Sequence, residues 1–144
     1  MYKIRIFSVG KTKEKWLDEA IAEYLKRLQQ TATIEFVLLK NDDLLTSAVQ
    51  KESDNGTVVL CLDATGKTLD SEGLSNYLLR QLELGGARLV LVIGGAEGLP
   101  PILKNSYPLL SLSALTFTHQ VIRLILVEQI YRAFEIAKGS KYHK

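Results

Sequence analysis

The alternation of apolar and polar positions predicts strands separated by amphipathic helices. Residues 2–9 alternate between the two classes, which is typical of a strand with one buried face. Residues 14–29 instead repeat apolar side chains at helical spacing, so these side chains share one face of a helix. The residues expected on that face are Trp16, Leu17, Ala20, Ile21, Tyr24, Leu25 and Leu28.

The same patterns continue to the C-terminus. The further strands are expected at 33–39, 57–62, 88–93 and 107–112, and the further helices at 42–52, 70–84, 101–105 and 118–138. The strand at 57–62 is apolar on both faces, as in the middle of a parallel sheet. Strands alternating with helices predict a single α/β domain over residues 1–144, with a mostly parallel sheet and helices on both faces.

Polar residues mark the ends of several of these elements. Asp42 or Asp43 is expected to cap the second helix. Residues 63–67 are expected to turn away from the third strand, and residues 85–86 supply a left-handed stop to the third helix. The buried side of the second helix is expected to hold Leu44, Leu45, Ala48 and Val49.

The last predicted helix is apolar around most of its circumference in its first half. Such a helix is buried on two sides, and in so small a domain only one side can cover the sheet. A second copy of the chain is the simplest cover for the other side, so we expect a homodimer. Arg123 shares a helical side with Val127 and Ile130, which predicts a buried cation in need of an anion or carbonyl partner. The alternative is that an arginine of this helix faces a ligand or a nucleic-acid phosphate.

Composition excludes several classes of protein. A hydrophobic fraction of 47% with 24% charged residues is that of an ordinary globular protein. No apolar run approaches the roughly 20 residues that span a bilayer, and the first residues lack a secretory apolar core, so we expect a cytoplasmic protein. Two histidines and one cysteine cannot form a metal-ligand cluster. Cys61 is expected to be a small buried hydrophobe.

Charge is unevenly distributed although the net charge is only +2. Residues 1–40 hold eight Lys or Arg against five acids, residues 41–118 hold five against nine, and residues 119–144 hold five against two. Two basic ends that meet in space would form a surface for a polyanion. Solvated surface charge is the alternative.

Two stretches imitate a phosphate-binding loop, at residues 10–12 and 66–68. Each lacks the glycine five positions before its own glycine, because Arg5 and Cys61 stand there, so both are expected to be turns. Residues 94–98 are rich in glycine but follow the fourth strand and lack the Gly-x-Gly-x-x-Gly spacing of dinucleotide sites. This segment is either a ligand-binding rim at the carboxyl end of a strand or a tight turn and nothing more.

The ordered succession of these motifs resembles the small ribosomal RNA large-subunit methyltransferase H family. The resemblance covers the whole chain and is carried by residues 92–98, 110–117, His119, Gln120, Arg123, residues 128–133 and the end Tyr142-His143-Lys144. These SPOUT-class enzymes methylate N3 of a pseudouridine in helix 69 of large-subunit ribosomal RNA. The resemblance implies a C-terminal trefoil knot, a homodimer, S-adenosylmethionine as cofactor and no metal.

The resemblance also implies site residues. The implied cofactor contacts are Leu62, Gly94, Gly95, Gly98, Leu112, Ser113, Ala114, Leu115, Thr116 and Phe117. Because N3–H of pseudouridine is a weak acid, a base or a neighbouring cation would assist its methylation. The candidates are His119, Arg123, Arg132, Tyr142 and His143. We expect His143 or Tyr142, from the partner subunit in one version of the hypothesis, to face the base while an arginine holds phosphate or a uracil oxygen. A knotted methyltransferase for tRNA or another RNA site, or a non-catalytic nucleotide-binding dimerisation module, are the alternatives.

Overall fold

Five parallel strands form one sheet in the computed structural model, which describes residues 1–144. The strands are β1 (Tyr2–Val9), β2 (Ala32–Leu39), β3 (Val59–Thr68), β4 (Arg88–Val92) and β5 (Leu109–Ser111). Their spatial order is β2-β1-β4-β3-β5, so β4 lies in the centre between β1 and β3. The predicted strands are therefore all present.

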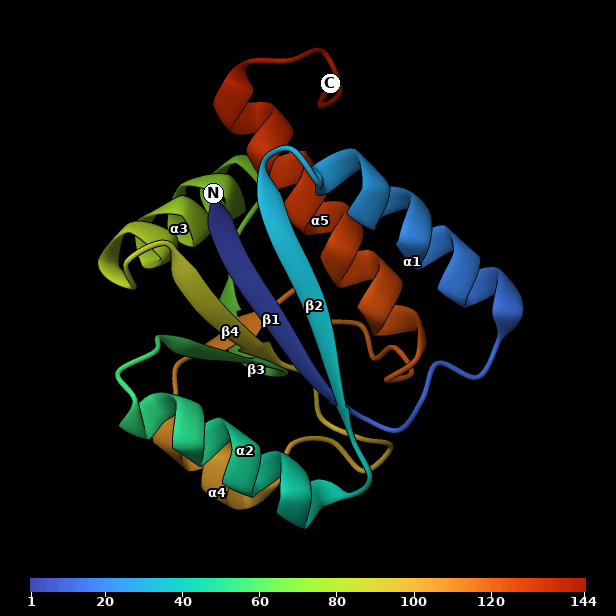
Figure 1. The fold of residues 1–144 in the computed structure, drawn as a ribbon, viewed down its shortest axis with the longest axis vertical. Helices are drawn as coiled ribbons and strands as arrows, with labels where there is room; N and C mark the ends of the chain where they lie inside the picture. The colour runs from blue at the N-terminus through green and yellow to red at the C-terminus, as the bar shows by residue number, and fades with distance from the viewer.

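Helices cover both faces of this sheet (Figure 1). On one face lie α1 (Lys15–Leu28), α3 (Ser71–Leu84) and α5 (Val121–Lys138), with α5 in contact with both of the others. On the other face lie α2 (Asp42–Asp54) and the short α4 (Pro101–Ser106). The predicted α/β class is confirmed, whereas the trefoil knot implied by the resemblance stays a prediction.

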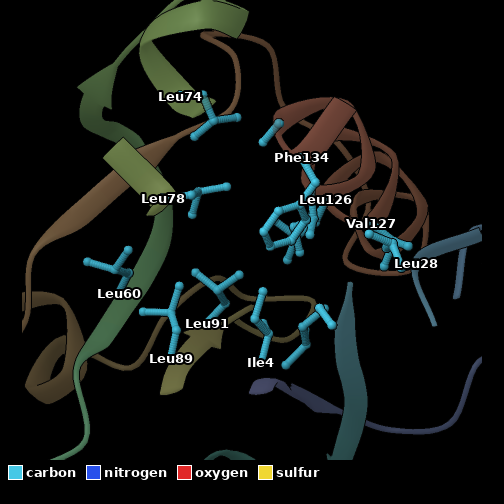
Figure 2. Close-up of a cluster of buried hydrophobic side chains, with 14 of the residues drawn as sticks. Ile4, Leu28, Leu60, Leu74, Leu78, Leu89, Leu91, Leu126, Val127 and Phe134 are labelled. Atoms are coloured by element: carbon cyan, nitrogen blue, oxygen red, sulfur yellow. The ribbon is translucent and has the colours of Figure 1, made fainter. Parts of the chain in front are cut away.

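The larger of two apolar cores lies between the sheet and the α1, α3 and α5 layer. Leu89 and Leu91 of β4 point toward Leu126 and Phe134 of α5, with Leu78 of α3 beside them (Figure 2). All five side chains are at most 5% exposed. Because α5 supplies buried residues along most of its length, its two ends are held at fixed places on the sheet.

Two expected apolar faces are narrower than the sequence pattern predicts. Trp16 of α1 is 59% exposed and Leu44 of α2 is 46% exposed. Each directly precedes a fully buried leucine, and neighbouring residues in a helix point about 100° apart, so only one of each pair can face the core. The cap of α2 is Asn41, whose side chain accepts a hydrogen bond from the backbone N–H of Leu44 at 2.9 Å, and not Asp42 or Asp43.

The third strand continues where a turn was expected. Residues 63–67 belong to β3, and its register with β5 shifts between Leu62 and Lys67, which marks a β-bulge. Gly66 lies so close to β5 that a Cβ there would fall 2.5 Å from the carbonyl carbon of Leu109. The strand thus bends at the end of the sheet where the glycine-rich turn lies.

No helix of the chain has both the length and the apolar character needed to cross a membrane.

Candidate cofactor and substrate site

A cavity of about 920 Å³ opens at the carboxyl ends of β3, β4 and β5, which is where open parallel sheets bind ligands. Four parts of the chain line it: the end of β3 (62–64), the turn after β4 (93–99), the loop between β5 and α5 with the first residues of α5 (112–122), and the start of α1 with the residues before it (13–17). Nine of the ten cofactor contacts implied by the resemblance are lining residues; Ala114, the tenth, lies in the same loop.

The turn after β4 is folded tightly on itself. The backbone N–H of Gly98 donates to the carbonyl of Gly95 at 2.9 Å. A Cβ at Gly94 would fall 2.5 Å from the backbone nitrogen of Leu99, so no side chain fits there. Gly98 has open space but a φ of +85°, which favours glycine. Two glycines are thus required for different reasons, and the result is a bare backbone wall in the cavity.

The loop over residues 112–117 is held by hydroxyl groups and leaves backbone groups free. The Ser111 hydroxyl donates to the Ser113 carbonyl at 2.9 Å, and the Ser113 hydroxyl accepts from the Leu115 N–H at 3.0 Å. The backbone N–H groups of Ala114, Thr116 and Phe117 have no partner within the chain. This wall can therefore offer backbone hydrogen bonds to a ligand without breaking any of its own.

The start of α5 fixes the fourth wall of the cavity. Gln120 accepts a hydrogen bond from the Lys13 N–H and donates one to the Lys11 carbonyl, both at 3.0 Å. Sequence reasoning missed this wall, because the contact joins residues more than a hundred positions apart and α1 was read only as a core helix. No local signal marks this wall, because Trp16 fits the apolar helical pattern and only the structure shows its exposure.

Arg123 has the buried, carbonyl-paired position that its helical side predicts. Its guanidinium is fully buried and donates to the Ser8 and Thr12 hydroxyls and to the carbonyls of Val9 and Gly10, at 2.8 to 3.1 Å. Arg123 is not a lining residue of the cavity. Arg123 therefore faces no phosphate in the single chain, and the alternative stays open only for Arg132. Arg123 instead supports the end of β1 and the loop that follows it.

His119 is the one predicted catalytic candidate that lines the cavity. Partial burial, together with the nearby positive charges of Arg123 and Lys13, lowers the pKa of its imidazole from the usual value near 6.5. The ring is therefore neutral at neutral pH and can accept a proton.

The other three candidates form a separate cluster near the C-terminal end of α5. Glu128 accepts a hydrogen bond from the Tyr142 hydroxyl at 2.6 Å and an ion-paired one from Arg132 at 3.0 Å. The other end of the Arg132 guanidinium lies 3.1 Å from Nδ1 of His143, and its carbon is 4.8 Å from the centre of the Tyr142 ring. Burial and the Glu128 carboxylate raise the pKa of Tyr142, so its hydroxyl stays protonated.

This cluster is remote from the cavity within one chain. Ile122 lines the cavity and Arg132 holds the tail, and ten helical residues separate them by about 15 Å along α5. The tail is ordered against its own helix rather than frayed, since Tyr142 also packs edge-on against Tyr131 with ring centres 4.7 Å apart. The structure therefore divides the predicted catalytic residues among three places: His119 lines the cavity, Arg123 is buried against residues 8–12, and the other three form the C-terminal cluster.

The chain belongs to the SPOUT methyltransferase family. The model of that family, described as a predicted SPOUT methyltransferase, matches residues 2–143.

Three relatives of known name match almost the whole chain, and each is a ribosomal RNA large subunit methyltransferase H. The protein of Protochlamydia amoebophila is 55% identical over 144 residues and covers all of both chains. The protein of Symbiobacterium thermophilum is 41% identical and that of Pelobacter propionicus 37%, with at least 98% of each chain covered. The family resemblance drawn from the motifs is thereby confirmed.

Solved structures support the fold. One, described as giving insights into the 2-OH methylation of C/U34 on tRNA, has a TM-score of 0.56 at 14% identity and covers 96% of this chain and 98% of its own. The SpoU methyltransferase AviRb from Streptomyces viridochromogenes, solved with the cofactor AdoMet, has a TM-score of 0.53 at 12% identity and covers 95% and 58%.

S-adenosylmethionine fits the chemistry of the cavity. The volume of about 920 Å³ is sufficient for a ligand of this size, and the walls combine apolar side chains with unpaired backbone N–H groups. Leu62, the Gly94 turn and the 112–117 loop would hold the cofactor, because these three segments meet around the same space.

Proposed function

We propose that this protein is an S-adenosylmethionine-dependent methyltransferase that acts on N3 of a pseudouridine in large-subunit ribosomal RNA. The observation that carries the proposal is the cavity itself, whose walls are the motifs that carry the family resemblance of the sequence. Its place of action would be the bacterial cytoplasm, where ribosomes are found.

The residues of the chain have little covalent work to do. The bound cofactor supplies an activated methyl group on a sulfonium. The glycine turn and the 112–117 loop orient that cofactor, and orientation with exclusion of water accounts for much of such a rate enhancement. We assign acceptance of the N3 proton of the acceptor base to His119, and its position in the cavity lining and its neutral ring support this role.

A second copy of the chain would complete the site. Val121, Ile125 and Ile136 lie on the side of α5 opposite its buried residues and are only half-buried, which supports a homodimer packed through this helix. The Arg132, Tyr142 and His143 cluster, about 15 Å from its own cavity, would then face the cavity of the partner subunit. There His143 and Arg132 would contact the acceptor base or a neighbouring phosphate.

Transfer of radiolabelled methyl groups tests this function. Purified large ribosomal subunits lacking the modification should accept close to one methyl group per particle, at a pseudouridine, whereas tRNA should accept none. Transfer to tRNA alone would favour the knotted tRNA methyltransferase. Calorimetry with S-adenosylmethionine separates both from a non-catalytic module, because no binding at millimolar cofactor would contradict any methyltransferase.

A further inference from the structure

Trp16 is an aromatic side chain at the cavity with no partner in the chain. It lines the cavity from the first turn of α1 and is 59% exposed. The loop before α5 lines the same cavity with Leu115 and Phe117, which are 70% and 36% exposed. Trp16 makes none of the chain's ring–ring or cation–π contacts.

The backbone that presents Trp16 is held rigidly. Arg123 donates hydrogen bonds to hydroxyls and carbonyls of residues 8–12. Gln120 makes hydrogen bonds with the backbone of Lys11 and Lys13. Leu17, the next residue, is 1% exposed in the core. An exposed indole on so firmly fixed a backbone loses little freedom when something stacks on it.

The loop beside Trp16 is basic. Residues 11–15 contain three lysines and one glutamate, a net charge of +2. Lys11 and Lys13 are exposed and make no ion pair, whereas Lys15 lies 3.9 Å from Glu19. Unpaired lysines next to an aromatic platform are the usual components of a site for single-stranded nucleic acid.

We infer that Trp16 stacks on an RNA base at the mouth of the cavity, with the ammonium of Lys13 on an adjoining phosphate, and so positions the strand that carries the acceptor base. This inference rests on the proposed function, because it assigns the RNA-facing wall of the same site. The 62–64, 94–98 and 112–117 segments hold the cofactor, and the α1 wall is left for the substrate. A second copy of the chain is a less suitable cover, since two unpaired lysines would be buried with the indole.

The experiment uses the fact that Trp16 is the only tryptophan of the chain. The indole fluorescence of the parent protein is measured while the protein is titrated, first with S-adenosylmethionine and then with a short RNA hairpin that carries pseudouridine in its loop. We expect the RNA to quench the emission and to protect the indole from acrylamide. Quenching by cofactor alone with no further change on adding RNA would overturn the inference, because Trp16 would then belong to the cofactor.

Two substitutions give the kinetic counterpart. Trp16→Ala should raise the KM for large ribosomal subunits roughly ten- to hundredfold, the range that loss of one stacked base produces, and leave cofactor affinity within about twofold. Trp16→Phe should recover most of this loss. Leu84→Ala, which removes another side chain that is 67% exposed but outside the cavity lining, is the matched control and should have no effect.

Each remaining outcome counts against or for the inference. An unchanged KM in Trp16→Ala, or a variant that sediments as a monomer where the parent is a dimer, would overturn it in favour of a bystander or an interface residue. If the parent failed to methylate ribosomal subunits, the proposed function would fall. The quenching of the parent's fluorescence by the RNA hairpin, and the hairpin affinity of Trp16→Ala, would still decide whether Trp16 binds RNA.

Discussion

The two ends of α5 are built in different ways. At its start, the cavity walls combine apolar side chains with bare backbone, Lys13 is the lysine in the lining, and the one titratable ring with a shifted pKa is a neutral histidine. At its end, the Glu128 carboxylate joins Arg132 and Tyr142, Arg132 in turn contacts His143, and the Arg132 side chain stays 25% exposed.

The difference indicates that the two ends of α5 serve different ligands, the cofactor at its start and the substrate at its end. The bare backbone of the glycine turn and of the 112–117 loop suits a cofactor whose position must be fixed, because backbone groups do not change rotamer. A side-chain cluster that includes a basic tail suits a polyanionic substrate. Since about 15 Å separates the two within one chain, both can serve one reaction only if two chains combine.

Replacing Gly94 by alanine should abolish cofactor binding in the cavity at the start of α5. A methyl group there would fall 2.5 Å from the backbone nitrogen of Leu99, so the turn must open and the cofactor wall is lost. We expect no S-adenosylmethionine binding by calorimetry and no methyl transfer. Gly56→Ala is the control, because it adds the same methyl group at a glycine with a φ of +85° that has free space around it and lies outside the cavity lining. Normal cofactor binding by Gly94→Ala would contradict the backbone-wall account.

Ending the chain before Tyr142 should remove the catalytic contribution of the C-terminal cluster and leave cofactor binding in the cavity intact. We expect methyl transfer to fall by about two to four orders of magnitude, the range for loss of general acid–base or charge-stabilising groups, while cofactor affinity stays unchanged. Steady-state kinetics and calorimetry on the same preparation measure the two effects. A shortened chain that lost both properties together would show that the two ends are not separate.

Arg123→Met should weaken the fold around the cavity rather than the chemistry. The substitution removes the donors that reach the Val9 and Gly10 carbonyls and leaves those acceptors unpaired. We expect a loss of about 2–4 kcal/mol in the free energy of unfolding, measured by urea denaturation. Arg123→Lys should recover part of it, and a variant as stable as the parent would remove the support role assigned to this residue.

The smallest effect should come from pH. The pKa of His119 lies below its usual value near 6.5, so the neutral, proton-accepting ring is formed as pH rises through the mildly acidic range. Methyl transfer by the parent should therefore rise with pH below about 6.5 and level off at neutrality, as general base catalysis requires. His119→Asn should lower the plateau about tenfold and lose this rise. An unchanged pH profile in the variant would remove His119 from proton transfer.

The sequence predicted most of the fold because each element carries its own periodicity. All five strands and all five helices lie where the patterns placed them, and the cofactor contacts implied by the motifs meet at one cavity. The errors arose where tertiary contacts decide. Trp16 and Leu44 are exposed because the leucine next to each of them occupies the core. Strand β3 continues past Leu62 because β5 pairs with it beyond a bulge.

The site was predictable only in part for a related reason. Glycines and a serine-rich loop form a motif that can be recognised in the sequence. The hydrogen bonds from Gln120 to the backbone of Lys11 and Lys13 instead join positions that no local pattern relates. The distance between the cavity and the C-terminal cluster also depends on the straight length of α5, which places His119 and His143 at opposite ends.

The most direct test of the account is to isolate dimers of two different defective chains. One chain carries Gly94→Ala with an intact tail, and the other has an intact cavity but ends before Tyr142; two affinity tags select the mixed dimer. If each site combines the cavity of one subunit with the tail of its partner, one working site forms, and methyl transfer should return to about half the parent rate per dimer. A parent chain paired with a chain carrying both defects should be inactive. The reverse result, with an inactive first pair and an active second pair, would show that each chain uses its own tail and would contradict the account.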